Sequence, residues 1–90
     1  TLMSDKKLQT VKVVLHWAWD PIGVRGIEGA LDEYDRYAPA VLALLDRETG
    51  DEEVGAYLTY VETERMGLPS HKQKNEDVAA LLRQLHALDQ

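Results

Sequence analysis

The chain has no cysteine, few basic residues and no long apolar segment, and each of these absences excludes a class of function. Without cysteine it can form neither disulfides nor thiolate metal sites. Ten basic against sixteen acidic side chains give a net charge of −6, which argues against binding to nucleic acid or to an anionic membrane surface. No apolar run approaches the roughly 18 residues of a membrane span, and no secretory signal pattern is present. We therefore expect a cytoplasmic protein with neither nucleic acid nor membrane as a partner.

The length of 90 residues predicts one domain, spanning residues 1–90. A chain of this size buries roughly 60–65% of the surface that its unfolded form exposes. Apolar residues make up 44% of the sequence, which is enough for a core but leaves no room for a deep cleft as well. We expect a small globular fold in which any site lies near the surface.

The first segment with helical periodicity runs from Ser4 to about Ala18. Ser4 is a suitable N-cap, and the spacing of apolar residues covers one helix face. The β-branched stretch "VKVVLHW" would also suit a strand, but length and the cap favour a helix. The helix should end near Trp19, because Asp20 precedes Pro21 and is therefore expected to be extended.

A glycine-rich loop of about twelve residues should follow, and Asp32 should then act as the N-cap of a second helix. One apolar stripe continues across Pro39 and favours a single helix over residues 33–47. Pro39 itself favours either a kink or a second helix start at Ala38. The sequence leaves these alternatives open.

Two further helices are predicted in the second half of the chain. Gly50 suits a tight turn, and Asp51 should cap a helix over about 52–66 that Gly67 ends. Asn75 should cap the last helix. The apolar stripe of that helix comprises Val78, Leu81, Leu82, Leu85 and Leu88. The predicted fold is all-α, a small bundle of four helices with a long loop between the first two.

Two charged residues of the third predicted helix lie on or beside its apolar face. At 100° per residue Arg65 falls inside the apolar arc and Glu62 lies next to it. Burying an unpaired charge costs several kcal/mol, so both should have partners. We expect Arg65 to pair with Asp20, Asp32 or Asp35, and Glu62 to accept hydrogen bonds from loop N–H groups or a tryptophan indole. Alternatively, Arg65 extends its charged end into water, or both residues belong to a ligand site.

The two tryptophans are expected to differ in environment. Trp19 falls on the core face of the first helix, whereas Trp17 points to its flank. A structural role, with partial cover by the loop, is one interpretation of both. The functional interpretation is an exposed aromatic anchor for a partner protein, because tryptophan and tyrosine dominate interface hot spots. Tyr57 and Tyr60 could extend such a patch.

No pattern in the sequence indicates catalysis or a bound metal. His16, His71 and His86 show none of the spacings of a metal site, and each is expected at the surface. The acidic segment "DPIGVRGIEGAL" lacks ligands where a calcium loop needs them. The glycines are not spaced as in a phosphate-binding loop. We expect a protein that is not an enzyme and that uses no cofactor.

Three stretches resemble a family of small bacterial proteins and domains of unknown function. They are "WDPIGV" at 19–24, "DEYDRY" at 32–37 and "ETERMGL" at 62–68. The order of the three motifs, spread over residues 19–68, makes the resemblance fairly specific. It implies a helical, bacterial, cytoplasmic protein without an established activity. The motifs could be shared because their residues hold the loop between the first two helices against the third helix, or because they form a common binding site.

The sequence therefore supports two hypotheses of different classes. The first is a non-enzymatic interaction module, immunity-like or regulatory, that presents its acidic loop and aromatic flank to a basic partner protein. The second is a small-molecule or divalent-metal site built from Asp20, Asp32, Asp35, Glu62 and Arg65. A homodimer is a further alternative. The candidate binding residues are Trp17, Trp19, Asp20, Asp32, Tyr34, Asp35, Glu62 and Arg65.

Overall fold

The computed structural model describes residues 2–23, 33–48 and 50–88, and within these ranges the fold is all-α. In chain order the elements are α1 (Leu2–Val14), η1 (Leu15–Trp19), η3 (Asp35–Tyr37), α2 (Ala38–Asp46), α3 (Asp51–Tyr60), η4 (Val61–Arg65) and α4 (Lys72–Leu88). The four α-helices confirm the predicted fold class. Two of them, α1 and α3, continue directly into a wider helical turn, η1 and η4 respectively.

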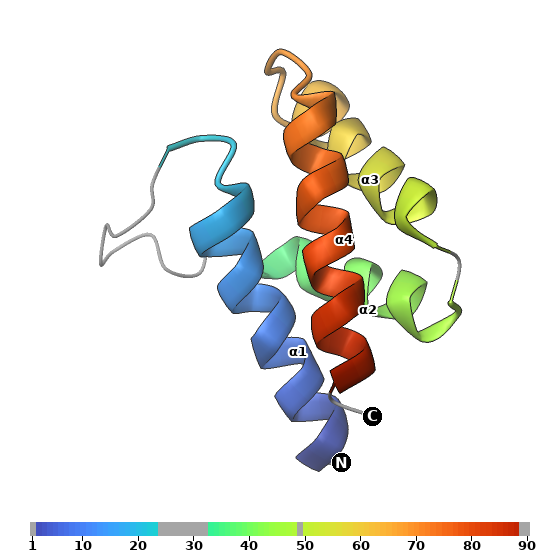
Figure 1. Ribbon diagram of the computed structural model, residues 1–90. Helices are drawn as coiled ribbons and strands as arrows, with labels where there is room; N and C mark the ends of the chain where they lie inside the picture. Colours follow the sequence, from blue (N-terminus) through green and yellow to red (C-terminus); the bar gives the residue numbers. More distant parts are fainter. Residues whose placement is uncertain (1, 24–32, 49, 89–90) are drawn as a thin grey trace.

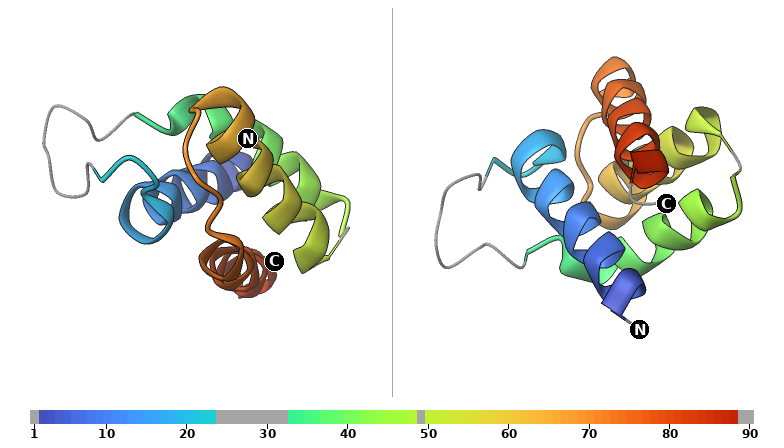
Figure 2. Two further views of the ribbon diagram at one scale, coloured as in Figure 1. Left: turned by 90° about the horizontal axis from the view of Figure 1, so that it is seen from above. Right: turned by 60° about the horizontal axis from the view of Figure 1, so that its bottom comes forward.

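The four α-helices pack into a small bundle in which α2 and α4 each contact the other three α-helices. In Figure 1, α4 lies in front between α1 and α3, and α2 crosses behind them. The two views in Figure 2 show the same relationship from above and from below. This arrangement brings η1, η4 and the start of α4 together at one end of the molecule.

One face of each helix contributes to a single core. Its largest fully buried apolar side chains are Trp19, Tyr34, Leu15, Leu58 and Leu82. The predicted stripe of α4 enters this core only in part, because Leu81 and Leu88 are 40% and 80% exposed. The buried face of α4 instead includes Asn75 and Ala79. The periodicity located the helix correctly but placed its buried face about one residue position away.

The boundaries of the first helix agree with the sequence at one end only. The helix ends at Trp19 as predicted, but it begins at Leu2, so that Ser4 lies within it and is not its N-cap. Asp20 is not extended; it is left-handed, with φ 36° and ψ 61°. Aspartate tolerates this conformation better than most residues, and the hydrogen bonds of Asp20 described below hold it there.

The alternatives at Pro39 are resolved in favour of a second helix start. A single 3₁₀ turn over Asp35–Tyr37 precedes α2, which begins at Ala38. Pro39 occupies the first turn of α2, where its missing N–H has no intrahelical partner to lose. The predicted cap Asp32 lies outside the described residues.

The ends of α3 and α4 include two further corrections. Gly50, with φ 94°, occupies the N-cap position of α3, so Asp51 is its first helical residue and not its cap. Gly67, with φ 67°, follows the helical segment as predicted. Asn75 does not cap α4, which begins at Lys72; it lies inside the helix with a fully buried side chain. The hydrogen bonds of that side chain explain its position.

Candidate functional site

The wide turns η1 and η4 each overlap one of the sequence motifs, "WDPIGV" at 19–24 and "ETERMGL" at 62–68 respectively. Asp20 N–H donates to the carbonyl of Leu15, and Met66 N–H donates to the carbonyl of Val61, both at 3.0 Å. Each bond spans five residues, as in a π-helix, and such turns are frequent at functional sites. A wider turn advances each residue by less than 100°. A helical wheel drawn at 100° per residue therefore gives the wrong direction for the side chains within the turn and after it.

Glu62 in η4 is completely buried, and both oxygens of its carboxylate accept hydrogen bonds. Oε1 accepts from the His71 backbone N–H at 2.8 Å and from Asn75 Nδ2 at 3.0 Å, and Oε2 accepts from His71 Nδ1 at 2.9 Å. Burial alone would raise the pKa of Glu62. The hydrogen bonds from His71 and Asn75 outweigh burial and lower that pKa below its ordinary value of 4.5.

Asn75 joins this carboxylate to the first helix. Its Oδ1 accepts the indole N–H of Trp19 at 3.0 Å, while its Nδ2 donates to Glu62 and to the hydroxyl of Thr59, both at 3.0 Å. We call Trp19, Glu62, His71 and Asn75 the buried network. It links η1, η4, the connection before α4 and α4 itself, and it satisfies each polar group that those contacts bury.

The sequence prediction for Glu62 is confirmed in part. Glu62 does point inward and is paired, but its described donors are His71 and Asn75, and none lies in the described parts of the segment 17–35, residues 17–23 and 33–35. The indole of Trp19 reaches Asn75 and not Glu62. Asn75 was missed because its side chain also suits a helix cap. The signal that could have found it is its position one turn before Val78, on the core-facing side of the last helix.

The predicted ion pair of Arg65 with Asp20 or Asp35 is wrong. Arg65 is exposed, and in the described ranges it pairs with no carboxylate. Asp35 lies 3.8 Å from Lys12 instead, and Asp20 accepts a hydrogen bond from Tyr34. The third proposed partner, Asp32, is not among the described residues. The reason for the error is the wide turn η4, which rotates Arg65 off the apolar arc.

Tyr34 bonds to the residues that directly follow the first helix. Its ring is 1% exposed and packs 5.3 Å from the ring of Trp19. Its hydroxyl donates to Asp20 Oδ1 at 2.8 Å and accepts the N–H of Ile22 at 3.0 Å. Burial raises the pKa of Tyr34 well above its ordinary range, so the hydroxyl stays protonated and keeps donating. The motif residues Asp20 and Tyr34 are thus explained as a structural clasp.

The two tryptophans lie in opposite environments, as predicted. Trp19 is fully buried, with the ring of Tyr37 packed edge-on at 6.3 Å. Trp17 is 49% exposed, with the ring of His16 4.9 Å from its own. An open groove of about 370 Å³, which we call the Trp17 groove, is lined by Gln9, Lys12, Val13, His16, Trp17 and Asp35. Val13 is 55% exposed, so the groove offers accessible apolar surface.

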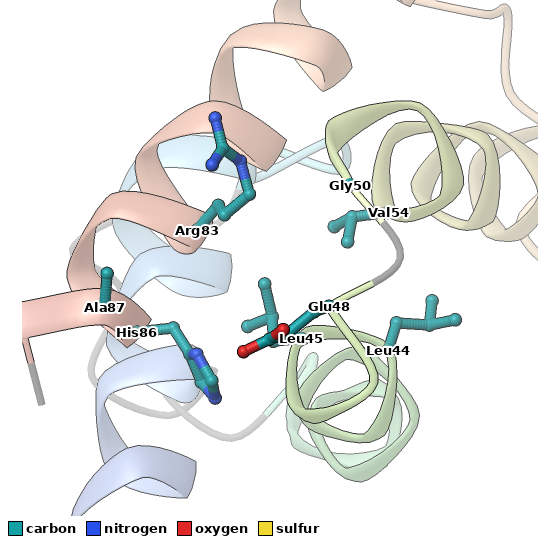
Figure 3. Close-up of a pocket in the computed structure, with 8 residues that line it drawn as sticks. All are labelled: Leu44, Leu45, Glu48, Gly50, Val54, Arg83, His86 and Ala87. Atoms are coloured by element: carbon teal, nitrogen blue, oxygen red, sulfur yellow. The ribbon is translucent and has the colours of Figure 1, made fainter. Parts of the chain in front are cut away.

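A second hollow, of about 280 Å³, lies between α2 and α4. Figure 3 shows Arg83 and His86 of α4 on one side of the hollow, and Leu45, Glu48 and Val54 on the other. Two of its charged or polar groups already have protein partners: Arg83 pairs with Asp51, and His86 Nε2 lies 2.8 Å from a carboxylate oxygen of Asp46. We therefore interpret it as a packing feature of the helix ends.

The expectation of surface histidines is correct only for His71, whose side chain is 49% exposed. His16 and His86 are buried, at 3% and 7% exposure. The ring of His16 packs edge-on against that of Trp17, and His86 Nε2 lies within hydrogen-bonding distance of the Asp46 carboxylate. Neither position could be distinguished from a solvated face by spacing alone.

No family model, curated protein or solved structure matches the chain. Among the residues that the structure describes, no cluster of three or more histidine, aspartate or glutamate side chains is placed to hold a metal ion. None of the described helices combines the length and apolar character that crossing a membrane requires.

Proposed function

We propose that the protein is a non-enzymatic interaction module, immunity-like or regulatory, whose Trp17 groove binds a partner protein. The observation that carries this proposal is the half-exposed indole of Trp17 beside the exposed side chain of Val13. Trp19, two residues away, already supplies the tryptophan that the core uses. Exposed tryptophans at the centre of an accessible apolar patch are the typical anchors of protein interfaces.

The chemistry of the surface favours a basic partner. The chain carries a net charge of −6, which speeds association with a basic protein in a salt-dependent way. Within the groove, Asp35 lies 3.8 Å from Lys12, and both side chains are partly exposed. An arginine or lysine of the partner could exchange with Lys12 at Asp35 and lie over the face of Trp17. In line with the family resemblance, we place this interaction in the bacterial cytoplasm.

No observation favours the alternative small-molecule or metal site. Of its five residues, Asp32 lies outside the described ranges. The other four have separate neighbours: Asp20 bonds to Tyr34, Asp35 lies near Lys12, Glu62 bonds to His71 and Asn75, and Arg65 is exposed. A site would require these side chains to converge on one solvent-accessible pocket.

Trp17→Ala tests the interaction module, with Leu88→Ala as the matched control. Both residues are exposed apolar side chains on helices, Leu88 at 80%. Pull-downs from bacterial lysate at low and moderate salt should capture a basic protein on the wild type and on Leu88→Ala. Capture should fall about 30-fold or more on Trp17→Ala, as for a hot spot of 2 kcal/mol. A captured protein that Trp17→Ala retains, or no specific capture at either salt concentration, contradicts the proposal.

Sedimentation of the three proteins distinguishes a partner from a second copy of the chain. If the wild type and Leu88→Ala self-associate and Trp17→Ala does not, the groove is a homodimer interface and the proposed basic partner is wrong. Concentration-independent monomers in all three cases leave the pull-down as the deciding measurement.

A further inference from the structure

A surface pocket formed by residues of η3, α3 and η4 combines arginines and tyrosines. It has a volume of about 300 Å³ and is lined by Arg36, Tyr37, Tyr57, Tyr60, Val61 and Arg65. We call it the arginine–tyrosine pocket. Its lining contains two cations and no carboxylate, although acidic residues outnumber basic ones sixteen to ten in the chain. A local excess of positive charge on an acidic protein requires an explanation.

The two arginines come from different elements and are both exposed. Arg36 lies in η3 and Arg65 is the last residue of η4, and the fold brings both to the lining of this pocket. Neither forms an ion pair with a carboxylate within the described ranges, whereas Arg83 pairs with Asp51. Guanidinium groups bind phosphate and carboxylate through two parallel hydrogen bonds. Two of them at one pocket therefore favour an anion.

The tyrosines supply a flat apolar wall. The rings of Tyr57 and Tyr60 are stacked, 6.4 Å apart and inclined by 29°, and Tyr60 is 49% exposed. Burial raises the pKa of Tyr57, the neighbouring hydroxyl of Tyr37 raises it further, and the charge of Arg65 acts in the opposite direction. Arg65 is thus close enough to Tyr57 for its charge to be felt. Neutral phenols can donate hydrogen bonds to an anion, and their rings can stack on a planar ligand.

An adjoining hollow limits the charge of the ligand. It has a volume of about 270 Å³ and shares Arg36, Tyr37 and Arg65 with the arginine–tyrosine pocket. Its other lining residues are Ile22, Glu33, Met66 and Leu68. The two arginines therefore lie where the hollows meet, and Glu33 would repel a second anionic group beyond them. This favours one anionic group at the arginines and an uncharged ring against the tyrosines.

We propose that the arginine–tyrosine pocket binds a small ligand that carries one phosphate or carboxylate group next to a flat ring. Arg36 and Arg65 hold the anionic group, and the stacked Tyr57 and Tyr60 hold the ring. The site is separate in its residues from the Trp17 groove, so it adds a binding function to the proposed interaction and does not depend on it.

Titration of the protein with phenyl phosphate, benzoate and inorganic phosphate tests the site. Binding is followed by NMR through the arginine side-chain N–H and tyrosine ring signals at about 0.15 M ionic strength. We expect saturable binding of phenyl phosphate at least tenfold tighter than that of inorganic phosphate. Benzoate decides whether a carboxylate replaces the phosphate. The shifts should centre on Arg65, Tyr57 and Tyr60.

Substitutions separate this site from general charge attraction. Arg65→Ala should weaken phenyl phosphate binding at least tenfold, and Tyr60→Ala should reduce its advantage over inorganic phosphate. Arg47→Ala is the matched control, because Arg47 is exposed at the end of α2 and lines neither hollow. It should bind as the wild type does. Trp17→Ala should also leave this binding unchanged, so that the two proposals fail separately.

Three outcomes would overturn the proposal. The first is the absence of saturable binding of either ring compound in the millimolar range, where ligands of this size are expected. The second is equal loss of binding on Arg65→Ala and Arg47→Ala, which would indicate only the overall charge. The third is unchanged affinity on Arg65→Ala while the variant remains folded by circular dichroism.

Discussion

Glu62 and Arg65 lie three residues apart on η4, yet their side chains occupy opposite environments. Glu62 is completely buried, and three donors from His71 and Asn75 surround its carboxylate. Arg65 is exposed and lines two open hollows. A buried charge must be satisfied within the protein, whereas an exposed one keeps its hydrogen bonds to water and remains available.

The comparison separates residues that hold the fold from residues that can bind. The buried network has little capacity left for a ligand, because its polar groups already bond to one another. Each proposed binding surface includes a residue of an element that the network joins: Trp17 of η1 in the Trp17 groove and Arg65 of η4 in the arginine–tyrosine pocket. A rigid and saturated interior beneath open side chains is a suitable support for recognition. Substitutions of the buried residues should therefore destabilise the fold, whereas matched substitutions of exposed residues should not.

Asn75→Leu should have the largest effect on stability. It removes the acceptor of the Trp19 indole and one donor to Glu62, and leaves both groups buried without those partners. We expect a loss of about 3–4 kcal/mol in the free energy of unfolding, measured by urea denaturation. Gln84→Leu, at an exposed position of the same helix, should change it by about 0.5 kcal/mol or less. A loss below about 1 kcal/mol for Asn75→Leu would mean that the network does not hold the fold.

Glu62→Gln should cost less, about 2–3 kcal/mol at pH 7, because the shape is kept and the charge is lost. Glu62 has a pKa below 4.5 in the folded protein, so its contribution is present above pH 4.5 and is lost as the pH falls through the folded pKa. The difference between wild type and variant should therefore shrink below pH 4.5. Urea denaturation at several pH values measures it.

Glu64→Gln is the matched control for that pH dependence. Glu64 is exposed on the same turn, so its substitution should change stability by about 0.5 kcal/mol or less at every pH. A wild-type-minus-Glu62→Gln difference that stays constant on acidification would show that the charge of Glu62 contributes nothing to folding.

Tyr34→Phe should have the smallest of the three effects. It removes the hydroxyl that donates to Asp20 and accepts from the N–H of Ile22. We expect a loss of about 1.5 kcal/mol, the lower end for a hydrogen bond to a charged group. Tyr60→Phe removes a hydroxyl from a ring that is 49% exposed and should be close to neutral. If both variants unfold at the same urea concentration, Tyr34 is not a clasp.

The helices and some of their ends could be predicted from the sequence because local chemistry determines them. Apolar spacing located the four helices, and a glycine with positive φ follows the third. Trp19 on the core face and Trp17 on the flank also followed from the first helix's period. These features depend on residues close together in the chain, so a single sequence carries the information.

The details that failed depend on tertiary contacts. The π-helical turn at η4 is not visible in residue spacing, and it moved Arg65 away from the predicted ion pair. Asn75 was interpreted as a cap because nothing local indicates that Trp19 and Glu62 converge on it. The left-handed conformation of Asp20 accompanies its bond to Tyr34, fourteen residues later. The proposed binding surfaces share this limit, since Arg36 and Arg65 meet only in the folded chain.

The bond between Tyr34 and residues 20–22 has a consequence for how this protein can change. One side chain both fills the interior and bonds to two polar groups twelve and fourteen positions earlier in the chain. Phenylalanine would keep the packing and lose both bonds, and a smaller polar residue would leave a cavity beside Trp19. Position 34 should therefore tolerate fewer replacements than the exposed tyrosine at position 60.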